Sequence, residues 1–318
     1  MIHFLRLIRP VNLLIIAVTM YSFGGYLDYV YLDESQGEML IQTFNFFLLV
    51  LSTVMIAAAG NIINDYFDVR ADRINRPEQT IIMKHIKRRW AIVYHWILNF
   101  VAFGIAIHLG LASDTFWYVF IHLLSINLLW IYSMQLKRTL VIGNVVIALL
   151  TALVPVLVGI YYQDIFRTVI LEEAYPFHLN NYQYFPVYIG LGLGLFAFIL
   201  NWTREIIKDM EDVEGDKVLK ARTIPIVYGL QKARNISIFF ILITMTLTVP
   251  VVWFWKTGFV VGMALLPLIL SAFSAIFSML ILFKPLSPKN IKIADLGIKL
   301  TIIFGMILPL FWIFQILN

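Results

Sequence analysis

Nine stretches of almost uninterrupted apolar residues, each about 20 residues long, limit what this chain can fold into. A helix of about 20 residues spans the hydrocarbon core of a bilayer. The stretches are residues 11–31, 44–63, 90–111, 115–136, 139–162, 185–202, 236–255, 259–283 and 293–317. The chain is 61% hydrophobic and only 14% charged, which is more apolar surface than soluble cores bury. We therefore predict an all-α, polytopic membrane protein with nine transmembrane helices.

The basic residues predict how these helices lie in the membrane. If the N-terminus is cytoplasmic, all but three of the 24 Lys and Arg residues fall on the cytoplasmic side; the exceptions are Arg167, Lys256 and Lys299. Such an excess is typical of the cytoplasmic loops of multi-pass proteins. We predict a protein integral to the plasma (inner) membrane with a cytoplasmic N-terminus. The net charge of +5 then reflects topology, and we expect neither nucleic acid nor an obligate protein as a partner.

An acidic motif occurs twice in the chain. Asp65, Asp68 and Asp72 recur 144 residues later as Asp209, Asp212 and Asp216. Each copy follows the second apolar stretch of a group of four, so both copies are expected at the cytoplasmic face. We predict one transmembrane domain over residues 1–318, made of parallel pseudo-repeats 1–138 and 139–285 and a ninth helix, 286–318.

The spacing of these acids indicates their chemistry. Intervals of three and four place the carboxylates on one stripe of a helix or its continuation, where like charges repel. One such motif is equally typical of a solvated acidic loop, but two matched copies on one side favour a cation site. Mg²⁺ takes few carboxylates directly and bridges to phosphate oxygens, while Arg and Lys neutralise the remaining phosphate charge. The absence of Cys excludes disulfides and thiolate metal sites.

These motifs resemble those of the UbiA family of intramembrane prenyltransferases. Asn64, Asp68 and Asp72 fit its Asn-x-x-x-Asp-x-x-x-Asp signature, and Asp212 and Asp216 fit its Asp-x-x-x-Asp signature. The resemblance implies nine helices around a central cavity, with a Mg²⁺-bound prenyl diphosphate under a cytoplasmic cap. It also implies a dry cavity for a carbocation formed when the metal and basic side chains neutralise the leaving pyrophosphate.

The resemblance further implies a role for each candidate site residue. The catalytic residues would be Asn64, Asp68, Asp72, Asp209, Asp212 and Asp216. Two Mg²⁺ ions would be bound, one by Asn64, Asp65, Asp68 and Asp72 and the other by Asp209, Asp212 and Asp216. The diphosphate would be bound by Arg9, Asn12, Arg73, Tyr132, Lys137, Arg204 and Lys208.

The acceptor is the least constrained part of the prediction. The second motif, with Arg222-Thr223-Ile224-Pro225 after it, is most similar to the digeranylgeranylglyceryl phosphate synthase branch. That branch implies transfer of a geranylgeranyl group to the glyceryl hydroxyl of geranylgeranylglyceryl phosphate. An aromatic quinone precursor of the 4-hydroxybenzoate, homogentisate or dihydroxynaphthoate type is the alternative acceptor. Outside this class, a divalent-cation transporter would need its acids near the bilayer midplane. The expected partners are thus a prenyl diphosphate, a lipid-like or aromatic acceptor, and membrane lipids.

Two other features favour structural roles. Asp295 and Lys299 lie four residues apart in the last span, which is typical of an ion pair within one helix. The Gly190-x-Gly-x-Gly194 run follows no predicted strand, so it predicts close helix packing and not a nucleotide-binding loop.

Overall fold

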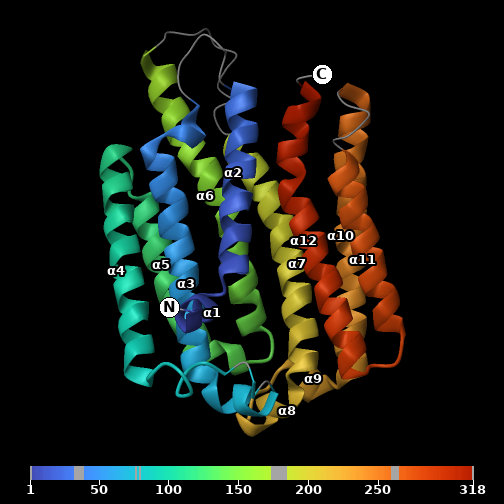
Figure 1. Ribbon diagram of the computed structural model, residues 1–318. Coiled ribbons are helices and arrows are strands. Elements are labelled where there is room, and N and C mark those ends of the chain that lie inside the picture. The colour runs from blue at the N-terminus through green and yellow to red at the C-terminus, as the bar shows by residue number, and fades with distance from the viewer. Residues whose placement is uncertain are drawn as a thin grey trace.

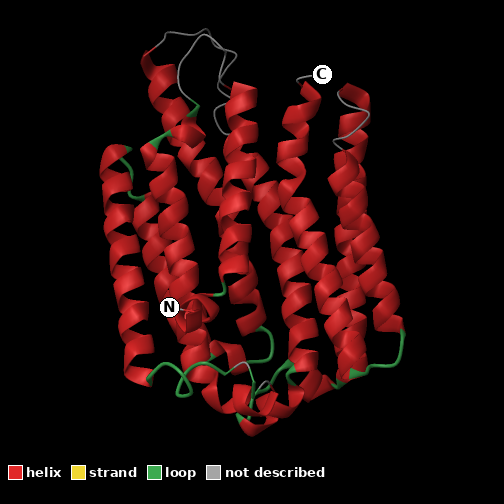
Figure 2. Ribbon diagram, in the orientation of Figure 1, coloured by secondary structure: helices red, strands yellow, loops and turns green. Residues whose placement is uncertain are grey.

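The chain forms a bundle of long helices that run side by side (Figure 1). The computed structural model describes residues 2–31, 39–75, 77–78, 80–172, 185–258 and 265–316. Within these residues nine helices are long and apolar enough to cross a membrane. Figure 2 shows helices and loops but no strand in the same residues. The all-α fold with nine candidate spans is confirmed.

The nine long helices agree with the nine apolar stretches in order and position. They are α2 (Pro10–Tyr31), α3 (Phe44–Asn75), α4 (Arg88–Ala112), α5 (Trp117–Met134), α6 (Ile142–Glu172), α7 (Phe185–Glu211), α10 (Leu230–Gly258), α11 (Leu266–Phe283) and α12 (Pro288–Ile316). Short helices are α1 (Ile2–Ile8), α8 (Val213–Val218) and α9 (Ile224–Tyr228), and 3₁₀ turns are η1 (Leu40–Gln42) and η2 (Leu136–Arg138).

Several helices extend beyond the apolar stretches that predict them. Helix α3 continues from residue 63 to Asn75, and α7 continues from residue 202 to Glu211. Apolar residues mark the part of a helix suited to lipid, and a helix can continue into water with polar side chains. Helix α6 likewise continues past residue 162, where its apolar stretch ends, to Glu172. Residues 173–184, between two predicted spans, and the predicted span residues 259–264 and 317 lie outside the described residues.

Helices α6 and α7 pack closely through glycines. A Cβ atom added to Gly190 would lie 2.9 Å from the carbonyl oxygen of Pro155, and one added to Gly194 would lie 2.9 Å from that of Ala152. A Cβ atom on Gly192 would meet nothing within 4 Å. Small residues let backbones approach in membranes, where lipid tails are as apolar as the side chains and packing holds helices together. The predicted packing role is confirmed for Gly190 and Gly194.

The buried apolar side chains form two main clusters. The first lies among helices α2, α3, α4, α5 and α6 and includes Phe23, Phe46 and Tyr162. The second joins α7, α10, α11 and α12 and includes Ile206 and Ile298. The two halves of the chain therefore have largely separate cores. The finer division into two sequence pseudo-repeats stays a prediction.

One end of the bundle carries the polar elements. Helices α8 and α9 lie across this end, at the bottom of Figure 1, and α12 ends at the opposite end of the bundle. The loop 77–87 and the turn η2 lie beside them, and the short helix α1 lies in the same half of the bundle. Both acidic motifs are on the segments that reach this end.

Candidate active site

The first acidic motif lies on the polar extension of α3. Asn64, Asp68 and Asp72 are spaced by four residues, so they share one face of this helix. Asp68 is buried, with only 5% of its surface exposed. A carboxylate this deep needs a counter-charge, because burial penalises its ionised form.

Lys137 of the turn η2 supplies that counter-charge. Its Nζ atom donates a hydrogen bond to Asp68 and another, over 3.4 Å, to Oδ1 of Asn64. Burial alone would lower the pKa of this ammonium, but the adjacent Asp68 raises it above its ordinary value. Lys137 is therefore a permanent positive charge against the first motif. Tyr132, one turn earlier on α5, is itself buried and lies within electrostatic reach of Lys137.

The second motif is divided by a break in the helix. Asp209 is on α7, which ends at Glu211; Asp212 is at the break; Asp216 is on α8. The sequence analysis placed these acids on a helix or its continuation, and Asp216 lies on that continuation, beyond the break at Asp212. Asp209 is buried and accepts a 2.9 Å hydrogen bond at Oδ2 from Nδ2 of Asn144, which is near the start of α6.

The side chain of Asn75 connects the two motifs. Its Oδ1 atom accepts a 2.8 Å hydrogen bond from the backbone N–H of Gly215, and its Nδ2 atom donates a 3.1 Å bond to the carbonyl oxygen of Asp212. A second link joins the neighbouring loops, since the backbone N–H of Arg222 donates to the carbonyl oxygen of Arg138 over 2.8 Å. The end of α3 is thereby fixed against α8, with the acids of both motifs in one region.

The pKa of Asp216 depends on the other charged side chains in this region. Burial raises the pKa of Asp216 to about 6; Lys137 opposes this effect, and the negative charges of Asp212 and Asp68 add to it. A carboxyl group whose ionised form is disfavoured in this way is short of positive charge. The pair of motifs thus has the electrostatic character of a cation site.

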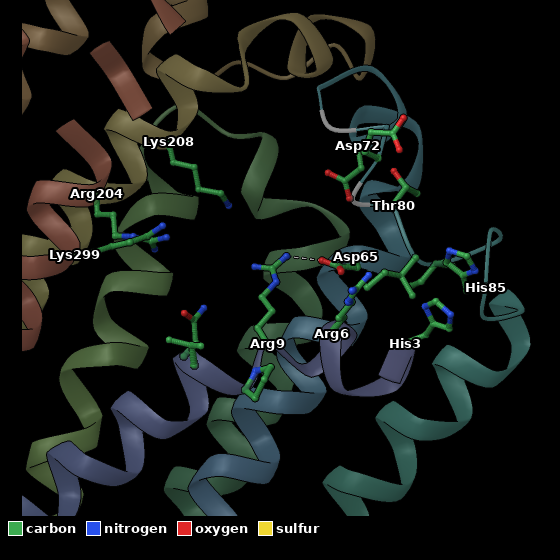
Figure 3. A pocket seen from close by; sticks show the side chains of 16 residues that line it. His3, Arg6, Arg9, Asp65, Asp72, Thr80, His85, Arg204, Lys208 and Lys299 are labelled. Atoms are coloured by element: carbon green, nitrogen blue, oxygen red, sulfur yellow. Dashed lines mark hydrogen bonds and ion pairs between the residues drawn. The ribbon is translucent and has the colours of Figure 1, made fainter. Parts of the chain in front are cut away.

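A polar cavity of about 580 Å³ adjoins the acids (Figure 3). It is lined by α1, the start of α2, the extension of α3, the loop 78–85, and parts of α7 and α12. Of the predicted site residues, it brings together Arg9, Asn12, Asp65, Asp72, Arg204 and Lys208. Lys299 of α12 also lines it.

Arg9 lies between α1 and α2 and reaches across the cavity to the first motif. Its Nη2 atom is 2.5 Å from Oδ1 of Asp65 (Figure 3). Burial acts to lower the pKa of the Arg9 guanidinium, but Asp65 raises it above its ordinary value. Arg9 has a φ angle of 55°, a left-handed conformation that is unfavourable for a residue other than glycine. The residue that forms the ion pair with Asp65 and lines the cavity therefore has a strained backbone.

Not every predicted residue lies at the cavity. Arg73 is exposed and its Nη2 atom lies 3.8 Å from the sulfur of Met83, in a separate surface hollow. Asp209 contacts Asn144 and does not line the cavity. The other predicted residues that do not line it are Asn64, Asp68, Tyr132, Lys137, Asp212 and Asp216. Two important residues were missed by the sequence analysis, Asn75 and Asn144. Both lie in stretches that resemble the family outside its acidic signatures, residues 72–77 and 143–144, and this was the signal that could have found them.

The donor set fits a hydrated Mg²⁺ ion better than a closed protein cage. Among the residues that the structure describes, no three His, Asp or Glu side chains are close enough to enclose a metal alone. Mg²⁺ keeps several waters and binds through one or two carboxylates together with phosphate oxygens. Carboxylates on two facing segments, with Lys137 beside them, suit that mode of binding.

Comparison with known proteins identifies the family. Residues 35–280 match the UbiA prenyltransferase family. The digeranylgeranylglyceryl phosphate synthase of Pyrococcus horikoshii is 36% identical over 271 residues, covering 84% of this chain and 82% of that protein. The synthase of Thermococcus sibiricus is 30% identical over 301 residues, covering 94% and 92%. The chain belongs to the UbiA prenyltransferase family, and it is a multi-pass membrane enzyme that transfers prenyl groups.

Solved structures share the arrangement of helices. A structure of digeranylgeranylglyceryl phosphate synthase matches with a TM-score of 0.62 and 24% identity, covering 98% of this chain and 97% of that chain. A UbiA homolog from Archaeoglobus fulgidus, bound to GPP and Mg²⁺, matches with a TM-score of 0.55 and 19% identity, covering 96% and 99%. At these identities the likeness supports the fold.

Proposed function

We propose that the protein transfers a geranylgeranyl group from geranylgeranyl diphosphate to the glyceryl hydroxyl of geranylgeranylglyceryl phosphate. The observation that carries this proposal is the shared name of relatives that are 30–36% identical over most of the chain, all digeranylgeranylglyceryl phosphate synthases. The glyceryl oxygen forms a bond to C1 of the prenyl chain, and the bond from C1 to the diphosphate oxygen breaks. The hydroxyl proton leaves, so the products are an ether and hydrogen pyrophosphate.

The two acidic motifs would hold Mg²⁺ against the diphosphate. In this proposal Asn64, Asp65, Asp68 and Asp72 serve one ion, and Asp212 and Asp216 serve a second. Bound Mg²⁺ would neutralise the charge that develops on the leaving pyrophosphate. The acidic donor set, the raised pKa of Asp216 and the Mg²⁺-bound homolog from Archaeoglobus fulgidus support this assignment. Asp209, predicted as a further ligand, is buried and accepts a hydrogen bond from Asn144, so in this proposal it supports the other acids and does not bind the ion.

Basic side chains would bind the remaining diphosphate charge. Lys137 already contacts the first motif, and Lys208 lies at the cavity on the last turn of α7. Arg9 reaches the same region from the junction between α1 and α2, and Asn12 follows it in the first turn of α2. Preorganised donors of this kind stabilise a leaving group without reorganisation during the reaction. Arg73 points to Met83 and would contribute to this charge only by moving.

The apolar bundle would protect the reactive carbon. A carbocation-like C1 is quenched by water, so the reaction needs a site from which water is excluded. Tyr132 is buried next to Lys137 and presents an aromatic ring, whose face attracts positive charge. We propose that Tyr132 lies beside the prenyl C1 when the diphosphate is bound.

The acceptor assignment is tested by product analysis. Membranes containing the protein are incubated with labelled geranylgeranyl diphosphate, Mg²⁺ and one acceptor at a time: geranylgeranylglyceryl phosphate, 4-hydroxybenzoate, homogentisate or dihydroxynaphthoate. We expect an ether product only with the glyceryl phosphate, and none after chelation of Mg²⁺. A prenylated aromatic product in place of the ether would overturn the acceptor assignment while leaving prenyl transfer intact.

The role of the acids is tested by Asp68→Ala and Asp212→Ala. Both should abolish product formation, because each removes a ligand from one side of the proposed metal site. Glu214→Ala is the matched control, since Glu214 is in the same segment but its side chain is 75% exposed and paired with Lys217. Unchanged turnover in either aspartate variant would refute the metal assignment.

We propose that the protein lies in the plasma (inner) membrane with its N-terminus and both motifs facing the cytoplasm; the concentration of basic residues on the motif-bearing side supports this orientation. The chain contains no cysteine, so single cysteines report accessibility without background. Lys84→Cys, in the loop at the motif-bearing end, should react with a membrane-impermeant maleimide only in inverted vesicles. Phe116→Cys, between α4 and α5 at the other end, should react only in right-side-out vesicles. The opposite pattern would reverse the topology.

A further inference from the structure

One wall of the cavity is cationic and lies apart from the acids. Arg204 and Lys208 of α7 and Lys299 of α12 line this wall. In Figure 3 they lie on the opposite side of the cavity from Asp72 and Asp65, with Arg9 between. Every acid that lines the cavity belongs to α3 or to the loop after it. The basic groups on the α7–α12 wall therefore face the cavity with no carboxylate lining it beside them.

The buried carboxylate of Asp295 forms ion pairs with two of these cations, Lys299 and Arg204. Oδ2 of Asp295 lies 2.7 Å from Nζ of Lys299, and Oδ1 of Asp295 lies 3.3 Å from Nε of Arg204. The side chain of Asp295 is only 9% exposed, and it does not line the cavity. The pairing predicted for Asp295 and Lys299 is present, and Arg204 makes it a triad between two helices.

The guanidinium of Arg204 keeps hydrogen-bonding capacity for a ligand. Its Nη1 atom is 3.3 Å from Glu205, and its Nε atom is buried without a well-formed hydrogen bond. Arginine has five N–H donors, so these two contacts leave others that face the cavity. The planar fork of Arg beside the point charge of Lys299 is a combination that suits a phosphate group.

This wall is set away from the proposed metal site. Arg204 precedes Asp212 by eight residues, which corresponds to about 12 Å along a helix. On this separation we assign the donor diphosphate to the acids and leave Arg204 and Lys299 to another anion. The reaction proposed above, on which this inference rests, brings a second anion into the same cavity, the phosphate of the acceptor.

We infer that Arg204 and Lys299 bind the phosphate monoester of the acceptor, with Asp295 as the residue that positions them. The donor diphosphate is held at the acids, with Lys208 one helical turn from Asp212, so the two anions use different cations of the cavity. The α7–α12 wall then selects acceptors that carry a phosphate. Arg204, predicted from sequence to bind the donor diphosphate, is thereby reassigned to the acceptor.

The test separates the KM values of the two substrates. Lys299→Met keeps the length of the side chain and removes its charge. We expect the KM for geranylgeranylglyceryl phosphate to rise by about tenfold or more, as for the loss of one charge-assisted contact, while the KM for the donor changes less than about twofold. Lys299→Arg keeps the charge and should stay within about threefold of the parent. Lys292→Met, at an exposed position earlier on α12, is the matched control and should change neither KM.

A dephosphorylated acceptor supplies the second readout. Geranylgeranylglycerol lacks the phosphate, so the parent enzyme should discriminate against it, and Lys299→Met should lose most of that discrimination. Asp295→Asn should raise the acceptor KM with little change in kcat, as expected of a positioning residue. If Lys299→Met fails to fold because it leaves Asp295 with one partner fewer, the double variant Asp295→Asn/Lys299→Met removes both charges and takes its place.

The outcomes distinguish this inference from the proposed function. If the parent enzyme makes no ether from any glyceryl acceptor, the proposed function fails. If it makes the ether but Lys299→Met leaves the acceptor KM and the phosphate discrimination unchanged, the phosphate site is refuted. An equal rise in the donor KM would also refute it, since Arg204 and Lys299 would then bind the diphosphate.

Discussion

The side-chain amide of Asn75 bonds the backbone N–H of Gly215 over 2.8 Å, joining residues 140 positions apart in the chain. Through this bond and the one to the carbonyl oxygen of Asp212, the end of α3 is fixed to the break between α7 and α8. This contact keeps the acids of the two motifs close to one another. Its removal should therefore affect chemistry more than overall stability.

Asn75→Ala tests this coupling. Each neutral hydrogen bond contributes about 0.5–1.5 kcal/mol, so their loss should let α8 move without unfolding the bundle. We expect kcat/KM to fall by about tenfold and the Mg²⁺ concentration for half-maximal activity to rise, measured by Mg²⁺ titration of the turnover rate. Asn290→Ala, whose side chain bonds the carbonyl oxygen of Pro285 on the same side of the bundle, should leave both unchanged. An unchanged Mg²⁺ requirement in Asn75→Ala would contradict the coupling.

Lys137→Gln should separate donor binding from folding. The ammonium of Lys137 is the permanent positive charge beside Asp68, and an amide in its place donates hydrogen bonds without neutralising phosphate. We expect kcat/KM for the prenyl diphosphate to fall by about 100-fold or more, as when a charge-stabilising donor is removed from an active site. Lys84→Gln, an exposed position in the neighbouring loop, serves as control. Turnover within twofold of the parent would show that Lys137 is structural.

Asp209→Asn distinguishes a ligand from a support. An asparagine at this buried position can still accept the hydrogen bond from Asn144, so the fold should tolerate it. We expect turnover to fall by less than about tenfold, whereas Asp212→Asn should cost at least about 100-fold because the carboxylate itself is needed there. Steady-state turnover rates of the two variants at saturating Mg²⁺ measure these losses. Equal losses in the two variants would make Asp209 a direct metal ligand.

Gly194→Ala tests the packing of α6 against α7. The added methyl group would lie 2.9 Å from the carbonyl oxygen of Ala152, so the helices must separate. Overpacking of this kind costs about 1–3 kcal/mol, and the midpoint of thermal unfolding in detergent should fall by several degrees. Gly192→Ala is the matched control on the same helix, because its methyl group meets open space. We expect that variant to be unchanged or more stable, since alanine favours helix. Equal effects at the two positions would argue against a glycine-dependent interface.

Sequence patterns predicted the spans better than the site. Nine apolar stretches are long enough for a bilayer, and two acidic motifs at one offset are too regular for chance, so fold class and family followed from the chain alone. The break in the helix at Asp212 could not be predicted, because the helical spacing of the acids continues through it in the sequence. The hydrogen-bond partners of Asp68 and Asp209 could not be predicted either. Lys137 and Asn144 are brought to them only by helix packing, which a periodic pattern does not specify.

The contacts of Asn75 are both made to backbone atoms, and so is the link between Arg222 and Arg138. A backbone N–H or carbonyl group is present whatever side chain its residue carries. The link between Arg138 and Arg222 is therefore independent of their side chains, and these two positions can vary over evolutionary time while the link is retained. Gly215 differs from them, because an added Cβ atom would overlap the side chain of Asn75, so the junction requires glycine at this position.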